Sequence, residues 1–315
     1  MNKPKIVLIA GPTGVGKTAS SVYLAEKLDT DIISCDSMQI YRGMDIGTAK
    51  VTAQEARGVV HHMTDIVDPD EIFSVAEYVE RASSVVYDLD KKGKISLVVG
   101  GTGLYADSLI KGIEFEKDAD ADTLYREEMV ELAQKEGALS IHKMLEEVDP
   151  ESALAIHPNN VKRVIRALEY YHVTGKRISE HNRITKEKES PFESLRLYFT
   201  RDRENLYKRI DMRVDMMFDD GLEEEVQKLL SAGIGADTTA MQALGYKETA
   251  SALRGEITID EARELIKRDS RRYAKRQLTW FRRDAGGIWL NLDEFSSPCE
   301  VADKCFAIIK ERNML

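Results

Sequence analysis

The sequence is poor in cysteine, in long apolar runs and in low-complexity segments. Its three cysteines, Cys35, Cys299 and Cys305, have neither the spacing of a metal-binding pair nor the even number of a disulfide framework. We therefore expect free thiols in a reducing cytoplasm. No apolar stretch approaches the about 20 residues that cross a bilayer, and the run at residues 6–10 is too short for a secretory signal. These absences exclude a membrane protein and a disulfide-stapled secreted domain.

The chain is acidic overall but contains two basic segments, which we call basic islands. Its 315 residues carry a net charge of −10, and 43% are hydrophobic, which suits a folded core with one large domain or a second smaller one. Residues 263–283 contain nine Lys or Arg against two acidic residues, and residues 160–188 contain eight against three. We interpret both islands as localised phosphate-binding surfaces. For residues 160–188, a merely solvated helix face remains an equal alternative.

The N-terminal segment contains the most informative motif. An apolar run at residues 6–10 leads into G-x-x-x-x-G-K-T at residues 11–18, and a helix-compatible stretch follows. This is the strand, loop and helix order of a phosphate-binding P-loop, rather than a glycine-rich turn with a chance lysine. Lys17 would add a charge on the phosphates, and the Thr18 hydroxyl would ligate Mg²⁺. The motif alone does not distinguish a nucleotide from another pyrophosphate.

Alternating strand and helix patterns predict an α/β fold with a P-loop NTPase-like parallel sheet. A capping box at Ser74 and Glu77 marks one helix start. Strand patterns disappear in residues 114–191, which we interpret as an inserted helical domain; residues 1–113 and 192–315 then form the catalytic core. The expected strands are residues 6–10, 31–35, 95–99, 195–199 and 288–290, and the expected helical stretches include residues 19–28, 74–91, 204–232 and 259–283.

Three features follow successive predicted strands: the P-loop, Asp36 and the glycine-rich turn at residues 100–103. Ligands bind at the carboxyl edge of such sheets, so Asp36 can face the phosphates as a general base or a metal-linked carboxylate. An aspartate that only caps the following turn is the alternative. The strand at residues 95–99 ends in Gly100 and Gly101 instead of the aspartate of many P-loop hydrolases, which argues against a simple ATPase.

The second basic island interleaves cations with large aromatic residues. Cations can hold phosphates and aromatic rings can stack on unstacked bases, so residues 272–283 are candidates for RNA binding. The alternative is a helix that packs Trp280 and Phe281 into the core while its arginines face solvent.

In its motifs, the chain resembles the bacterial tRNA dimethylallyltransferase (tRNA isopentenyltransferase) family from end to end. The matching segments are the P-loop, I-S-C-D-S-M-Q-I-Y at residues 33–41, M-D-I-G-T-A-K at 44–50, His61-His62, V-G-G-T-G-L-Y at 99–105, His157-Pro158-Asn159, R-V-I-R-A-L-E at 163–169, Leu244-Gly245-Tyr246 and A-K-R-Q-L-T-W-F-R at 274–282. The P-loop alone is generic, but this ordered set is specific.

The resemblance implies transfer of a dimethylallyl group from dimethylallyl diphosphate to the exocyclic amine of the adenine 3′ of the anticodon in tRNA, with Mg²⁺ as cofactor. It implies a cytoplasmic enzyme without a membrane partner, and we expect a monomer. The implied catalytic residues are Asp36, Thr18 and Arg213; the implied diphosphate site is Gly11, Pro12, Thr13, Gly14, Val15, Gly16, Lys17 and Thr18, with Thr18 the metal ligand. The implied contacts to the tRNA anticodon stem-loop are Asp36, Ser37, Met38, Gln39, Thr102, Arg126, Lys162, Arg163, Val164, Ile165, Arg166, Gln242, Gly245, Tyr246, Lys275, Arg276, Trp280 and Arg282.

Two other functions remain open on the residues alone. A P-loop small-molecule kinase would use Asp36 to activate a hydroxyl, but it needs neither the basic aromatic segment nor the helical insertion. A nucleotide-switched RNA-binding module would bind RNA without forming a product. A GTPase is disfavoured because no N-K-x-D guanine-reading segment is present.

Overall fold

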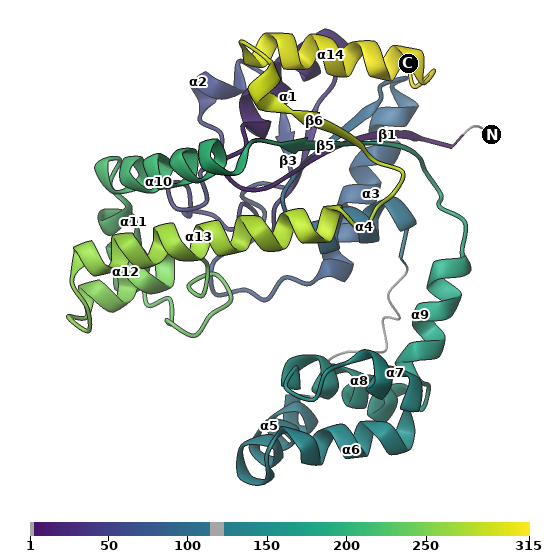
Figure 1. Cartoon of the computed structure of the whole chain (residues 1–315), viewed down its shortest axis with the longest axis vertical. Helices are drawn as coiled ribbons and strands as arrows, with labels where there is room; N and C mark the ends of the chain where they lie inside the picture. Colours follow the sequence, from purple (N-terminus) through teal and green to yellow (C-terminus); the bar gives the residue numbers. More distant parts are fainter. Residues whose placement is uncertain (1–2, 114–122) are drawn as a thin grey trace. The chain divides into compact units, whose positions relative to one another are not determined.

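The computed structural model of the chain describes residues 3–113 and 123–315 and is built on a six-stranded sheet (Figure 1). The strand order is β3-β2-β4-β1-β5-β6, and every neighbouring pair is parallel. The strands are β1 Lys5–Ala10, β2 Ile32–Cys35, β3 His61–His62, β4 Ser96–Gly100, β5 Glu193–Thr200 and β6 Ile288–Asn291. The predicted α/β fold with a parallel sheet is confirmed.

The central strands are apolar throughout because helices cover both faces of the sheet. Ile6–Ala10 of β1 and all of β4 are buried, as expected for parallel strands with two covered faces. The helices of this core, with one 3₁₀ turn, are α1 Lys17–Leu28, α2 Ala53–Ala56, α3 Val75–Lys91, α4 Gly103–Lys111, α10 Arg203–Asp219, α11 Leu222–Ser231, α12 Tyr246–Leu253, α13 Ile259–Phe281, η1 Leu292–Glu294 and α14 Pro298–Glu311.

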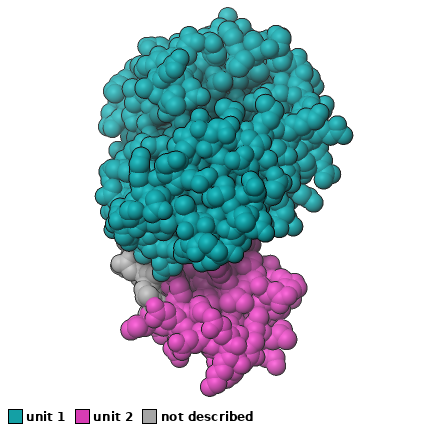
Figure 2. All heavy atoms as spheres, turned by 90° about the vertical axis from the view of Figure 1, so that its left-hand side faces the viewer, with its two compact units in different colours: residues 1–112, 190–315 teal, residues 113–189 magenta. Residues whose placement is uncertain are grey.

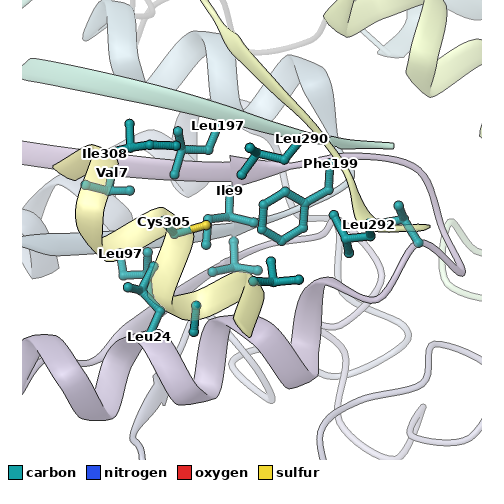
Figure 3. Packing of buried hydrophobic residues seen from close by; sticks show 14 of the residues in the cluster. Val7, Ile9, Leu24, Leu97, Leu197, Phe199, Leu290, Leu292, Cys305 and Ile308 are labelled. Carbon is teal, nitrogen blue, oxygen red and sulfur yellow. The ribbon is translucent and has the colours of Figure 1, made fainter. Parts of the chain in front are cut away.

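One face of the sheet forms the main hydrophobic core. Alternate residues of the strands, such as Val7 and Ile9 of β1 and Leu97 of β4, point to this face, and α1 and α14 cover it with Leu24 and Cys305 (Figure 3). These five residues are 1% exposed or less. The packing fixes β1 and α1, and thereby the loop that joins them.

The strand register brings three loops to one edge of the sheet. Ala10 at the end of β1 pairs with Gly100 at the end of β4, and Gly100 pairs with Cys35 at the end of β2. The strands approach so closely there that a Cβ on Gly100 would lie 2.0 Å from the Cys35 carbonyl oxygen. The P-loop, Asp36 and the turn after β4 therefore begin side by side.

The insertion is a separate helical unit. The structure divides into one unit of residues 1–112 and 190–315 and a second of residues 113–189 (Figure 2). The helices of the second unit are α5 Thr123–Glu136, α6 Ala138–Val148, α7 Pro150–Ala155, α8 Val161–Thr174 and α9 Ile178–Glu187. Its core includes Ile141 and Leu145 of α6 and Val164 and Leu168 of α8.

Most expected elements are present, with local differences. The helical stretch at residues 204–232 is two helices, because Gly221 adopts a φ of 98° between α10 and α11. Ser74 and Glu77 form the predicted capping box. The two-residue strand β3 and the short helix α2 have too little pattern for sequence reasoning to find. None of the helices in residues 3–113 and 123–315 is both long and apolar enough to span a membrane.

Candidate active site

The P-loop connects β1 to α1 and leaves the N-terminus of α1 open to an anion. Gly16 precedes the helix with a φ of 109°, a left-handed conformation that favours glycine. No side chain of the described residues caps this end, and the first turn contains no acidic residue. Free N–H groups and the helix dipole therefore favour a phosphate at this position.

Lys17 is a partly buried cation. Its Nζ donates hydrogen bonds of 2.9 Å to the carbonyl oxygens of Gly11 and Pro12. Burial lowers the pKa of Lys17 to about 8, with a further lowering by Arg213 and a partial compensation by Asp36. The present neighbours of the ammonium group thus do not offset the cost of burial, and an anion in the loop would stabilise its charge.

Asp36 and Arg213 reach the same place from β2 and α10. The charge of Asp36 acts on both Lys17 and Arg213, while burial lowers the pKa of Arg213. Arg213 Nε is buried and has no hydrogen-bond partner among the described residues. A buried unpaired donor is costly, so an acceptor in this site would stabilise it. Asp36 Oδ1 also accepts the Met38 N–H at 3.0 Å, so the turn-capping alternative describes a second role of the same carboxylate.

Thr102 lies in the turn after β4, the strand between β2, which precedes Asp36, and β1, which precedes the P-loop. Its Oγ1 accepts the Ser37 N–H at 3.0 Å and donates to Ser37 Oγ at 3.3 Å. Tyr273 of α13 hydrogen-bonds Thr102, and burial beside Asp36 raises the pKa of Tyr273 to about 12. Burial likewise raises the pKa of Cys35 to about 12, so this thiol is neutral and not a nucleophile.

Two arginines that sequence reasoning did not identify bind the outside of the P-loop. Arg201 Nε donates to the Val15 carbonyl at 2.9 Å and also forms an ion pair with Asp293. Arg209 Nε donates to the Gly14 carbonyl at 3.0 Å. The available signal is the spacing of Arg209 and Arg213, four residues apart on one helix face.

The cations of residues 263–283, in α13 and directly after it, fall into two groups. Arg263 and Lys267 pair with Asp215, Arg271 pairs with Asp211, and Arg268 and Arg272 pair with Asp269. In the part of the chain that the structure describes, the remaining four cations have no carboxylate within ion-pair distance. These are Lys275, Arg276, Arg282 and Arg283.

The aromatic residues of the same segment face the protein. Phe281 is buried, and Trp280 Nε1 donates to Asp107 Oδ2 at 3.0 Å. A Cβ on Gly103 would lie 2.3 Å from the Trp280 ring, which shows how closely the indole packs on the start of α4. Phe281 therefore packs into the core and Trp280 packs on α4, while the neighbouring cations are exposed. An RNA-binding role of this segment stays a prediction.

In the insertion, the expected RNA-binding residues have different environments. Arg126 and Arg166 both bind the carboxylate of Glu169, which is 1% exposed. The side chains of Val164 and Ile165 lie in the helical core, so only their backbone could contact a ligand. Lys162 and Arg163 are exposed, and neither has a carboxylate partner among the described residues.

The remaining expected RNA contacts lie in a buried network around Glu225 and in the turn after Asp36. Glu225 accepts the N–H groups of Asp45, Ile46 and Gly47 and the hydroxyl of Tyr246. Gly245 and Tyr246 are buried, so they support the loop at residues 45–47. Gln39 is likewise bonded to Ser34, Thr48 and Ala49, whereas Met38 is half-buried and Gln242 is exposed.

A magnesium ion fits the site only if the ligand supplies most of its oxygens. The described residues contain no group of three His, Cys, Asp or Glu side chains that could hold a metal. The Thr18 side chain is exposed at the start of α1, and the charge of Asp36 acts on the adjacent residue, Lys17. Mg²⁺ commonly takes one or two protein ligands together with water and phosphate oxygens, and these residues suit that mode.

Comparison with known proteins identifies the family. The IPP transferase family model matches residues 39–284. A tRNA dimethylallyltransferase of Lachnoclostridium phytofermentans is 45% identical over 98% of this chain and 99% of its own length, and one of Bacillus cytotoxicus is 48% identical over 95% and 94%. The chain belongs to the tRNA dimethylallyltransferase, or IPP transferase, family.

Solved structures agree with this family over nearly the whole chain. The tRNA isopentenylpyrophosphate transferase of Bacillus halodurans matches with a TM-score of 0.72 and 43% identity, covering 99% of each chain. A eukaryotic dimethylallyltransferase described as acting on tRNA matches with a TM-score of 0.84 and 29% identity, covering 98% of this chain and 80% of its own. The family's P-loop fold with a helical insertion is therefore shared, and family membership replaces the kinase and switch alternatives.

Proposed function

We propose that this chain transfers a dimethylallyl group from dimethylallyl diphosphate to the exocyclic amine of the adenine 3′ of the anticodon in tRNA. The observation that supports it best is the meeting of Lys17, Arg213 and Asp36 at one sheet edge. Two partly buried cations without carboxylate partners within ion-pair distance in the described structure suit a diphosphate, and one carboxylate beside them suits an amine proton.

The donor half of the site is the P-loop. The N–H groups at the start of α1 bind the diphosphate, and Lys17 and Arg213 bind its oxygens. Both cations stabilise the negative charge that grows on the leaving oxygen as the carbon–oxygen bond breaks. Thr18 would hold Mg²⁺, which would neutralise part of the same charge.

The acceptor half of the site is formed by Asp36, Ser37 and Thr102. The adenine amine attacks the methylene carbon, so a nitrogen–carbon bond forms while the carbon–oxygen bond breaks and diphosphate leaves. Asp36 accepts the proton of the attacking amine. Thr102, held by Ser37 and Tyr273, contacts the base.

The RNA surface uses the cations that the protein leaves unpaired. Lys275, Arg276 and Arg282 of the α13 segment and Lys162 and Arg163 of the insertion bind phosphates of the anticodon stem-loop. The target adenine leaves the stacked loop to reach Asp36, at a cost of a few kcal/mol that these phosphate contacts offset. The enzyme acts as a monomer in this scheme.

Mass spectrometry of tRNA tests the proposal. Unmodified tRNA is incubated with the protein, Mg²⁺ and dimethylallyl diphosphate, and nuclease fragments of the anticodon loop are weighed. One dimethylallyl addition on the adenine 3′ of the anticodon is the expected result. An unmodified loop, or modification of another base, would contradict it. A parallel incubation with ATP in place of the isoprenoid should leave the RNA mass unchanged.

A further inference from the structure

Helix α13 presents three side chains to the active site at helical spacing. Tyr273, Gln277 and Trp280 follow each other at intervals of four and three residues, which places them on one face. Tyr273 contacts Thr102 and Trp280 contacts Asp107. The side chain between them, Gln277, is 6% exposed and has no part in the mechanism above.

Gln277 connects the two halves of the site directly. Its Oε1 accepts the Thr13 N–H of the P-loop at 2.9 Å, and its Nε2 donates to the Gly101 carbonyl at 2.9 Å. The chemistry of the partners fixes the amide orientation, because an N–H can only donate and a carbonyl can only accept. A Cβ on Gly101 would lie 2.3 Å from Nε2, so the amide occupies the space that a larger residue would need.

The Gln277 side-chain amide lies just beyond the last paired residues of strands β1 and β4. Strands β1 and β4 are paired up to Ala10 and Gly100, and no further ladder pair joins them. Beyond that point the two chains separate, one into the P-loop and the other into the turn that carries Thr102. The Gln277 side chain, a peptide-like group with one donor and one acceptor, bridges them where the backbone no longer does.

We propose that Gln277 is a positioning residue that sets the distance between the diphosphate half and the adenine half of the site. This inference rests on the proposed function. The attacking nitrogen and the leaving oxygen must lie in line across the transferred carbon, and a misplacement of about 1 Å can lower a rate about 100-fold. Without the Gln277 amide, each substrate can still bind to its own half of the site. The alignment of the attacking nitrogen with the leaving oxygen is therefore lost more than the affinity for either substrate.

The first test is steady-state kinetics of Gln277→Met, which keeps the length of the side chain and removes both hydrogen bonds. We expect kcat per correctly folded site to fall about 10- to 100-fold, with KM for tRNA and for dimethylallyl diphosphate each within about threefold. The number of folded sites is counted by bound diphosphate. A kcat within about twofold of wild type would overturn the proposal, as would a raised KM for dimethylallyl diphosphate with unchanged kcat.

A matched control separates positioning from stability. Thr30 is also buried, and its Oγ1 donates to the Ile95 carbonyl at 2.6 Å near the amino ends of β2 and β4, away from the site. Thr30→Val should lower Tm to a similar extent as Gln277→Met and leave kcat unchanged. If both variants lower kcat in proportion to Tm, Gln277 is only structural and the inference fails.

A second variant keeps the test decisive should Gln277→Met fold poorly. The φ angle of Gly101 is not positive, so an alanine can adopt the same backbone conformation. Gly101→Ala therefore displaces the Gln277 amide without backbone strain. As a single variant, Gly101→Ala should lower kcat. In the double variant with Gln277→Ala, which removes the clashing amide, it should lower kcat little further. Additive losses in the double variant would contradict the proposal. A wild-type protein that modifies no tRNA would refute the proposed function itself, which is a distinguishable result.

Discussion

The phosphate-binding edge of the core and the helical insertion differ in how they pair charges that are partly or fully removed from solvent. In the insertion, the buried carboxylate of Glu169 is bound by two arginines, and buried Asp149 accepts hydrogen bonds from Ser152 and Ser179. At the sheet edge of the core, Lys17 and Arg213 have no carboxylate within ion-pair distance among the described residues. Glu169 and Asp149 in the insertion are satisfied by the fold, whereas Lys17 and Arg213 at the sheet edge are left for a ligand.

This difference separates structural from functional charge in one chain. An unpaired buried cation weakens the free protein, because burial penalises its charged form. Such a cost is kept where an incoming anion turns it into binding energy. A paired charge in the insertion stabilises the unit without offering a free group to RNA, so Arg126 and Arg166 differ from Lys162 and Arg163.

The largest expected effect is that of Asp36→Asn. The amide keeps the shape of the carboxylate and can still accept the Met38 N–H, but it cannot accept the amine proton. We expect single-turnover transfer to slow by about 10²- to 10⁴-fold. Filter binding of tRNA should be near that of wild type. Near-normal turnover at saturating substrates would remove Asp36 from the role of base.

Lys17→Met should have the next largest effect on transfer, and it should raise the stability of the protein. We expect about 10²- to 10³-fold slower transfer, because charge stabilisation at the leaving group is lost. At pH 7 the variant should melt at a higher temperature than wild type, since it no longer buries an ammonium whose pKa is lowered to about 8. A lower Tm would show that the hydrogen bonds to Gly11 and Pro12 outweigh this cost.

The same lysine predicts a pH dependence of diphosphate binding. The charged ammonium binds the anion, and in the free protein it loses its proton near pH 8. The contribution of Lys17 to diphosphate affinity should therefore be constant below this pH and fall by up to about tenfold per pH unit above it, until the raised pKa of the complex is reached. Calorimetry with inorganic diphosphate from pH 7 to 9.5 measures this as the ratio of the wild-type and Lys17→Met affinities at each pH, which cancels the titration of the ligand itself.

The sequence predicts the parts of this site that depend on local pattern. The P-loop follows from its motif, and Asp36 follows from its place after a strand at the carboxyl edge of a parallel sheet. Arg213 could be assigned only through the family resemblance. Gln277 escaped because its contact with Thr13 joins residues 264 positions apart, and it depends on how α13 crosses the sheet edge.

The insertion shows the same limit from the other side. Its helical nature is evident from composition, but the RNA contacts assigned by resemblance to Val164 and Ile165 fall in its core. Their spacing from Leu168, four and three residues away, already indicates a buried helix face. The pairing of Arg126 with Glu169 could not be foreseen, since it needs the packing of α5 against α8.

A smaller effect is expected for the double variant Lys162→Ala/Arg163→Ala. If these exposed cations contact two phosphates, the slope of log affinity against log salt should flatten by about 2 units, with weaker tRNA binding at low salt. Diphosphate affinity should not change. Tyr171→Ala, a partly exposed uncharged position on the same helix, serves as control. An unchanged slope would reduce this island to a solvated helix face.

The smallest effect on transfer, and a clear one on folding, is expected for Glu169→Gln. The neutral amide cannot pair with Arg126 and Arg166, which are 47% and 45% exposed and can turn to water. The unfolding free energy of the insertion should fall by about 1 to 3 kcal/mol, because charge-assisted hydrogen bonds of a buried carboxylate are replaced by weaker bonds to a neutral amide. Thermal melting with hydrogen exchange on α5 and α8 measures this loss, while kcat at a temperature where the unit is folded should match wild type. A comparable fall in kcat would mean that these arginines do act on the RNA, and that the division between charges satisfied by the fold and charges left for ligands does not hold in the insertion.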